Sequence, residues 1–141
     1  MDLGTLGRVW LPMLAGLVGV GWIFFAAPGP RGFERDLGLI LALIGLAGVI
    51  LSRYTLGRSF SIRAKATALV TDGIYSRIRN PIYVSGMFFI LGMVLIIGRF
   101  ELLAIFIVLV PLQIVRARRE AAVLEAKFGD EYREYRRRTW F

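Results

Sequence analysis

A pair of charged residues in this chain has the types and the spacing that binding chemistry requires. Arg116 and Glu120 lie four positions apart, and so on one face of a helix. A guanidinium can hold a carboxylate through two hydrogen bonds, and a carboxylate can accept hydrogen bonds from hydroxyl or ammonium groups. The chain has no cysteine and no histidine. This excludes thiol nucleophiles, histidine bases and Cys/His zinc sites, and we expect no metal.

A second group of polar residues lies in the segment Tyr54–Tyr83, which we interpret as a loop. Thr71-Asp72-Gly73 is typical of a turn. Asn80-Pro81 disfavours helix at Asn80 and predicts that a helix begins at or after Pro81. Backbone amides near Ile82–Val84 are then expected to be free, and free amides at a helix start bind carboxylates or phosphates.

These two groups resemble one known family when they are taken together. The chain contains TLGRSFSI, then LVTDGIYSRIRNPIYVSG, and later RARREAAVLEAKFGDEYREY. In this order and spacing, over residues 54–135, they resemble the isoprenylcysteine carboxyl methyltransferase family and its bacterial membrane relatives. Two residues depart from the family's pattern. Asn80 stands where the family has a histidine, and Ala121 replaces the second of two glutamates. Asparagine still donates and accepts hydrogen bonds as a neutral imidazole does.

The resemblance implies methyl transfer from S-adenosylmethionine at a site within the membrane. By this resemblance, Arg116 is the catalytic residue and faces the substrate carboxylate. Tyr75 and Tyr83 also offer aromatic faces to an adenine or a sulfonium, or they anchor the chain at the membrane interface. The residues implied to contact the cofactor are Thr67, Ala68, Leu69, Val70, Tyr75, Asn80, Pro81, Ile82, Tyr83 and Glu120.

A carboxylate is the methyl acceptor that this set of residues favours. A carboxylic acid with a pKa of about 4 is already ionised at pH 7, so its methylation needs no general base. An amine acceptor arrives protonated and would need Glu120 or a tyrosine as the base. Methylation of a phospholipid or another amine therefore stays an alternative. A non-catalytic membrane protein that retains the fold is another, because of Asn80 and Ala121.

The rest of the chain has the composition of a helical membrane protein. Hydrophobic residues make up 57% of its 141 residues, charged residues 20%, and the mean hydropathy is +0.65. Soluble domains are nearer 45–50% apolar. A bilayer core needs about 20 apolar helical residues. We therefore predict an all-α, multi-pass protein with four transmembrane helices, from four uncharged segments: Val9–Pro30, Leu37–Ser52, Asn80–Gly98 and Leu102–Val115.

The basic residues predict how these helices are oriented. With four spans, 15 of the 18 Lys and Arg residues fall on one side of the membrane and 3 on the other. The positive-inside rule then places both termini in the cytoplasm. We expect the helices to cross a plasma or inner membrane. The net charge of +8 thereby indicates contact with membrane lipid rather than nucleic acid. We expect a lipid-like small molecule or lipidated peptide as the substrate, entering from the bilayer.

One domain, residues 1–141, is predicted, with two halves of different character. Residues 1–52 form a helical pair in which glycines such as Gly16 and Gly45 allow close packing. Residues 53–141 comprise the cofactor loop, a hairpin of the last two spans, and cytoplasmic C-terminal helices. Gly129-Asp130 indicates a turn between two short helices in the tail after Ala117. Arg136-Arg137-Arg138 with Trp140-Phe141 is typical of an interfacial anchor, or else of a solvated basic tail.

Overall fold

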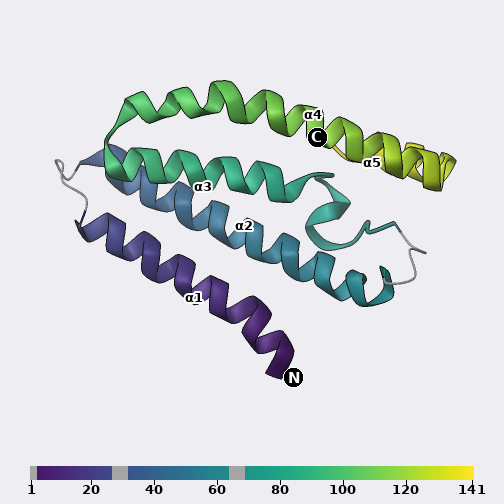
Figure 1. The fold of residues 1–141 in the computed structure, drawn as a ribbon, viewed down its shortest axis with the longest axis horizontal. Coiled ribbons are helices and arrows are strands. Elements are labelled where there is room, and N and C mark those ends of the chain that lie inside the picture. Colours follow the sequence, from purple (N-terminus) through teal and green to yellow (C-terminus); the bar gives the residue numbers. More distant parts are fainter. Residues whose placement is uncertain (1–2, 27–31, 64–68) are drawn as a thin grey trace.

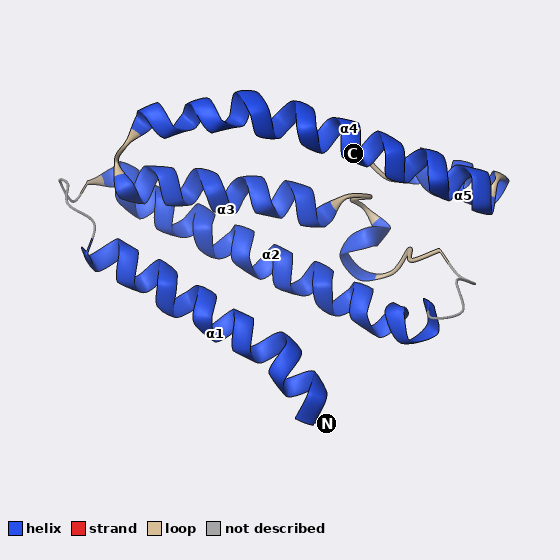
Figure 2. Cartoon of the chain, viewed as in Figure 1, coloured by secondary structure: helices blue, strands red, loops and turns tan. Residues whose placement is uncertain are grey.

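The part of the chain that the structure describes is helical, which confirms the predicted all-α class (Figures 1 and 2). The computed structural model describes residues 3–26, 32–63 and 69–141. Among these residues, the β-type pairing is confined to an isolated bridge between Ile78 and Trp140. The elements are α1 (Leu3–Ala26), α2 (Phe33–Arg63), the 3-10 helix η1 (Gly73–Ser76), α3 (Pro81–Ile97), the 3-10 helix η2 (Phe100–Ala104), α4 (Ile105–Phe128) and α5 (Asp130–Arg138).

Helix α2 is longer than the sequence predicts. The predicted second span is part of a helix that continues without interruption to Arg63. The start of the predicted loop, residues 54–63, is therefore helical, and that boundary is wrong. Two hydroxyl side chains near the predicted boundary, those of Ser52 and Thr55, bond within the helix instead of breaking it. Ser52 donates to the carbonyl of Gly48 at 2.6 Å, and Thr55 donates to the carbonyl of Leu51 at 2.9 Å.

Helix α3 begins at Pro81, which confirms the prediction from Asn80-Pro81. Two of the amides predicted to be free, however, are paired. The N–H groups of Tyr83 and Val84 both donate to the carbonyl of Asn80, at 3.0 and 3.2 Å. An anion site on these two amides is therefore a wrong expectation, because the Asn80 carbonyl already accepts the hydrogen bonds of the first helical turn.

Helices α2 and α3 lie side by side and pack through small residues (Figure 1). A Cβ atom added at Gly45 would lie within 3.0 Å of backbone atoms of Ser85 and Phe89. One added at Gly92 would lie within 3.0 Å of backbone atoms of Ala42. Glycine therefore permits a helix approach that any side chain would block, which confirms the predicted role of the glycines in the second span.

Helix α1 is held against α2 by a buried arginine. Arg35 is 4% exposed, donates a hydrogen bond to the backbone carbonyl of Phe24, and lies 5.1 Å from the centre of the Phe24 ring. Val20, Ala42 and Ile96 form a small buried cluster between α1, α2 and α3. The polar side chain and the apolar cluster together tie the first helix to the α2–α3 pair.

Helix α4 extends beyond the fourth apolar segment. It continues through Arg116 to Phe128, so the tail after Ala117 does not begin a separate short helix as predicted. Residues 117–128 contain no glycine or proline that would end the helix. The break comes at Gly129, with φ at 52°, and α5 follows at once. The turn predicted from Gly129-Asp130 is therefore confirmed.

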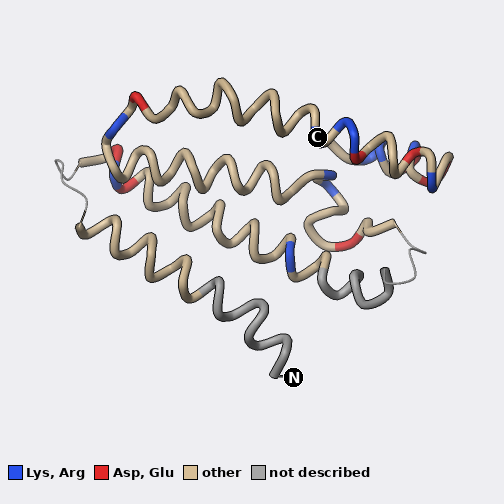
Figure 3. Tube along the Cα trace, in the orientation of Figure 1, with Lys and Arg blue, Asp and Glu red and all other residues tan. Residues whose placement is uncertain are grey.

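Among the residues that the structure describes, two helices are long and apolar enough to cross a membrane: Phe33–Leu56 and Phe100–Phe128. The apolar stretches Leu14–Ala26 and Pro81–Ile97 are shorter. Figure 3 shows charged residues gathered at two opposite ends of α2, α3 and α4, with an uncharged zone between them. This distribution is the one expected of helices whose middle lies in lipid and whose ends reach water.

Candidate active site

Three predicted site residues come together where the start of α3 faces α4. The hydroxyl of Tyr83 donates to Oε1 of Glu120 at 2.6 Å. Nε of Arg116 lies 3.7 Å from the same oxygen, as the i, i+4 spacing predicts. The guanidinium carbon of Arg116 lies 5.8 Å from the centre of the Tyr83 ring. We call these residues the Tyr83–Arg116–Glu120 cluster.

The cluster is open enough to receive a ligand. The side chains of Arg116 and Glu120 are 66% and 49% exposed. Within the part of the chain that the structure describes, the polar contacts of Glu120 both use Oε1, which leaves Oε2 for a ligand. The cluster therefore combines a cation, a carboxylate and an aromatic face at one position.

The other predicted cofactor residues lie on the segment that leads into α3. Thr67 and Ala68 lie outside the described residues. Val70 and Pro81 are buried, and Leu69, Asn80 and Ile82 are half-buried. The structure therefore brings Tyr83 and Glu120 into contact, while the cofactor contacts of the remaining residues stay predictions.

Tyr75 belongs to a buried hydrogen-bonded unit. It is 8% exposed, and its carbonyl accepts a hydrogen bond at 2.7 Å from the hydroxyl of Tyr135 on α5. Burial, reinforced by the nearby Tyr132 and Tyr75, raises the pKa of Tyr135 to about 12. The carbonyl of Tyr135 in turn accepts a hydrogen bond from Thr139 at 2.8 Å. The Tyr135–Tyr75 bond attaches η1 to α5, and the Thr139 bond holds the residue that follows α5 against the end of that helix.

The residues after α5 fold back onto the same loop. The N–H of Trp140 donates to the carbonyl of Arg77 at 3.0 Å, and the N–H of Arg79 donates to the carbonyl of Trp140 at 3.2 Å. The N–H of Asn80 donates to the oxygen of Phe141 at 2.9 Å. Trp140-Phe141, predicted from its composition as an interfacial anchor, is thus paired through its main chain with the strand-like approach to α3.

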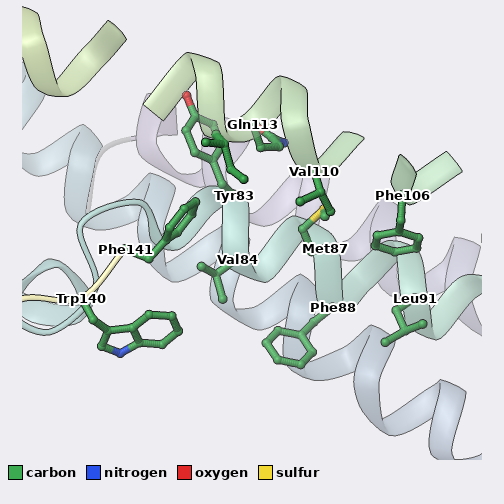
Figure 4. A pocket seen from close by; sticks show the side chains of 11 residues that line it. Tyr83, Val84, Met87, Phe88, Leu91, Phe106, Val110, Gln113, Trp140 and Phe141 are labelled. Atoms are coloured by element: carbon green, nitrogen blue, oxygen red, sulfur yellow. The ribbon is translucent and has the colours of Figure 1, made fainter. Parts of the chain in front are cut away.

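An apolar groove of about 330 Å³ lies between α3 and α4, and the ring of Tyr83 lines one end of it (Figure 4). Arg116 and Glu120 do not line the groove, and they adjoin it only through their contacts with Tyr83. Figure 4 shows Tyr83 and Phe141 at one end, and Leu91 and Phe106 at the other. The ring of Tyr83 lines the groove while its hydroxyl reaches Glu120 on α4. The lining residues are Tyr83, Val84, Met87, Phe88, Leu91, Phe106, Val110, Gln113, Ile114, Trp140 and Phe141.

Gln113 is a groove residue that the sequence analysis did not select. It is the one hydrogen-bonding side chain in the apolar segment Leu102–Val115. A single polar residue in such a segment is a candidate functional residue, so the sequence could have indicated it. Its Oε1 is buried and has no hydrogen-bond partner among the described residues. Trp140 and Phe141 were noted in the sequence, but their position in the groove was not foreseen, because it depends on contacts far apart in the chain.

Metal chemistry finds no support in the described geometry. No group of three or more Asp, Glu, His or Cys residues that could hold a metal ion occurs in residues 3–26, 32–63 and 69–141. The expectation of a metal-free site stays a prediction.

The fold and the site together define an all-helical protein with membrane-length apolar helices and an apolar groove that adjoins a charged cluster through Tyr83. The chain belongs to the phospholipid methyltransferase family, whose model matches residues 33–131. This range begins at α2 and ends in α5, and so it includes α3 and α4, the two helices that flank the groove. The resemblance to membrane methyltransferases seen in the sequence is thereby confirmed.

One curated relative is a protein of Schizosaccharomyces pombe. The chain is 39% identical over 89 residues to its "Protein-S-isoprenylcysteine O-methyltransferase". The aligned region covers 59% of this chain and 38% of that relative. The chain therefore spans well under half the length of the relative it matches. No solved structure matches the chain significantly.

Proposed function

We propose that this protein transfers a methyl group from S-adenosylmethionine to the carboxylate of an apolar acceptor in the membrane. The observation that carries the proposal is the apolar groove with Tyr83 at one end, where the tyrosine contacts Arg116 and Glu120. A groove of this kind binds a hydrocarbon chain by removing its apolar surface from water. The cation on the other side of Tyr83 suits the carboxylate that such a chain would carry.

The residues of the cluster fit the proposed cofactor. When bound, S-adenosylmethionine supplies a methyl group whose transfer to a carboxylate oxygen breaks the methyl–sulfur bond and leaves the electron pair on sulfur. Oε2 of Glu120 can accept hydrogen bonds from a ribose hydroxyl or an ammonium group. The ring of Tyr83 offers a π-face to a positively charged sulfur.

Arg116 is the residue that we assign to the acceptor. Its ion pair with Glu120 is long, at 3.7 Å, and its side chain is mostly exposed, so a ligand carboxylate can compete for it. Held by Arg116, the carboxylate would stand beside Tyr83 with one oxygen free to react. The chain would contribute orientation and exclusion of water, since the acceptor is already ionised.

We further propose that four helices span the membrane, with both termini and the cluster on the cytoplasmic side. The charge-free zone in Figure 3 and the excess of arginine at the cluster end support this orientation. The acceptor would then enter the groove from the bilayer, and the cofactor would arrive from the cytoplasm.

Three alanine variants of the detergent-solubilised full chain test these roles. Arg116→Ala should lower turnover by about 100-fold or more and leave the affinity for S-adenosylmethionine unchanged. Glu120→Ala should weaken cofactor binding by about tenfold, as for loss of a hydrogen bond to a charged group. Arg118→Ala, on the same helix, is the matched control. Unchanged turnover in Arg116→Ala would contradict its assigned role.

Methylation of a phospholipid amine is the second candidate, and the description of the matching family favours it. Glu120 would then have to accept a proton from the amine. Incubation with labelled cofactor and either isoprenylated cysteine or a defined phosphatidylethanolamine distinguishes the two by product mass. Absence of cofactor binding by folded protein would instead favour a non-catalytic member, as Asn80 and Ala121 suggest.

A further inference from the structure

We propose that Trp140 and Phe141 are specificity-determining residues that limit the size of the group next to the acceptor's carboxylate. This inference rests on the proposed function, because it takes the groove as the acceptor site. It concerns a segment that lies outside the range matched by the family model, residues 33–131.

The position of this segment is set by its main chain. Trp140 exchanges backbone hydrogen bonds with Arg77 and Arg79, and the oxygen of Phe141 accepts one from Asn80. Thr139, which is 9% exposed, bonds to the buried Tyr135. Because these bonds use the main chain of Trp140 and Phe141 and not their side chains, truncating either ring should leave the attachment of the segment in place.

Both rings form a wall of the groove at the end where Tyr83 lies. Figure 4 shows Phe141 beside Tyr83, and Trp140 next to Val84, whereas Leu91 and Phe106 lie at the far end. The far end, between apolar helices, would hold the hydrocarbon chain. The near end would hold whatever is attached close to the carboxylate, such as the amino substituent of a cysteine.

Two different selectivities follow from this arrangement. The residues at the far end set which chain lengths fit. Trp140 and Phe141 set how large a substituent fits beside the carboxylate, and their main chain is paired with the loop that carries Asn80. Removing one ring should therefore widen tolerance for head-group bulk without altering the preference for chain length.

The experiment compares two series of acceptors with the full-length protein. One series is S-farnesylcysteine with N-acyl groups of increasing size, and the other keeps the N-acetyl group and varies the isoprenoid from geranyl to geranylgeranyl. The variants are Trp140→Ala and Phe141→Ala. Trp22→Ala is the matched control, since Trp22 is 73% exposed on α1 and Trp140 is 61% exposed.

We expect Trp140→Ala or Phe141→Ala to raise relative kcat/KM for the bulky N-acyl acceptors on the order of tenfold, as for removal of a steric block in a pocket. The chain-length series should keep its order, and Trp22→Ala should match the wild type in both series. Thermal unfolding checks that the variants fold, which the main-chain pairing favours. Unchanged head-group selectivity in both folded variants would overturn the inference.

Direct binding separates this inference from the proposed function. The same acceptors are made to displace a fluorescent fatty acid from wild type and variants, with no cofactor present. If the acceptors bind but no methyl ester forms, the proposed function fails, and the head-group selectivity of binding still judges the inference. If neither the fatty acid nor the acceptors bind the wild type, both are overturned.

Discussion

The two faces of helix α3 differ in how closely the neighbouring helix approaches. On the α2 side, the backbones are so near that glycine is required at Gly45 and Gly92. On the α4 side, the two helices leave room for an apolar groove of about 330 Å³. One helix of 17 residues therefore has a closely packed face and an open face.

This difference shows how a small helical protein can hold a site without filling it. The α2–α3 pair supplies a fixed platform, because close backbone contact leaves little room for either helix to shift. Tyr83 stands on that platform and meets Glu120 across the open side. The α4 wall is joined to the platform through the connection at η2 and through the C-terminal segment, rather than by dense helix packing.

The largest effect is expected from filling the close side. Gly45→Leu would place a side chain into the backbone of α3, and overpacking that cannot relax costs about 3 kcal/mol. We expect a much lower midpoint of thermal unfolding in detergent and loss of a monodisperse species.

Gly86→Ala on α3 is the control for this prediction. No described heavy atom lies within 4 Å of a Cβ built at Gly86. This variant should be as stable as the wild type or slightly more so, since alanine favours helix. Equal stability of Gly45→Leu and wild type would show that the two helices do not need glycine to approach.

The next effect should come from loosening the attachment of the C-terminal segment. Tyr135→Phe removes the buried hydrogen bond to the carbonyl of Tyr75. We expect a loss of about 1–2 kcal/mol in the free energy of unfolding. Hydrogen exchange of the backbone amides in residues 73–80 should become faster, while exchange in α2 should not change. An equal increase in exchange rate in residues 73–80 and in α2 would contradict a local role for this hydrogen bond.

The pKa of Tyr135 also predicts that the stability of the protein depends on pH in the alkaline range. This folded-state pKa of about 12 lies above the ordinary value of 10.0, so the folded protein holds this proton more tightly than the unfolded chain does. The resulting stability is fully present below pH 10 and is lost as the pH rises toward 12. Tyr135→Phe should therefore show a shallower loss of stability over this interval, measured by thermal unfolding at a series of pH values.

A smaller effect of opposite sign is expected on the open side. Gln113→Leu replaces a buried oxygen that has no partner among the described residues with an apolar group of similar size. Without ligand, we expect a gain of about 1 kcal/mol in the free energy of unfolding. Thermal unfolding of the variant and the wild type measures this difference. A clear loss of stability would show that the Gln113 amide makes stabilising bonds, and that the groove wall is more polar than its lining indicates.

The smallest effect is expected at the exposed end of α5. Arg133 forms ion pairs with Glu125 at 3.0 Å and with Asp130 at 2.7 Å, but its side chain is 58% exposed. Such pairs contribute little to stability, since water and salt screen them. Arg133→Ala should therefore shift the unfolding midpoint only slightly, and added salt should reduce that shift. A loss as large as that of Tyr135→Phe would mean that these charges hold the C-terminal helix in place.

Much of the helical framework could be predicted because its signals are local. Uncharged segments of membrane length predict apolar helices, Asn80-Pro81 predicts the start of α3, and Gly129-Asp130 predicts the turn before α5. The errors in the predicted framework lie at the ends of helices. The helix after Ser52 and the free amides near Tyr83 both depend on which carbonyl a particular donor reaches, and the sequence pattern does not specify this.

The site was predictable only as far as helical spacing extends. Arg116 and Glu120 share a face because they are four residues apart, and the structure has them as an ion pair. The partner Tyr83 lies 37 positions from Glu120, and nothing local to either residue indicates that their oxygens meet. Their proposed roles toward cofactor and acceptor stay predictions until binding is measured.

Composition, periodicity and motif order are properties of the chain alone, and they were enough to predict the helical class, the uncharged segments and the family. They do not predict that one face of α3 is closed and the other open, or that Trp140 and Phe141 return to line the groove. A helix has several faces, and packing between distant segments selects the neighbour of each face. A side chain's partner depends on that choice, and not on the residues beside it in the chain.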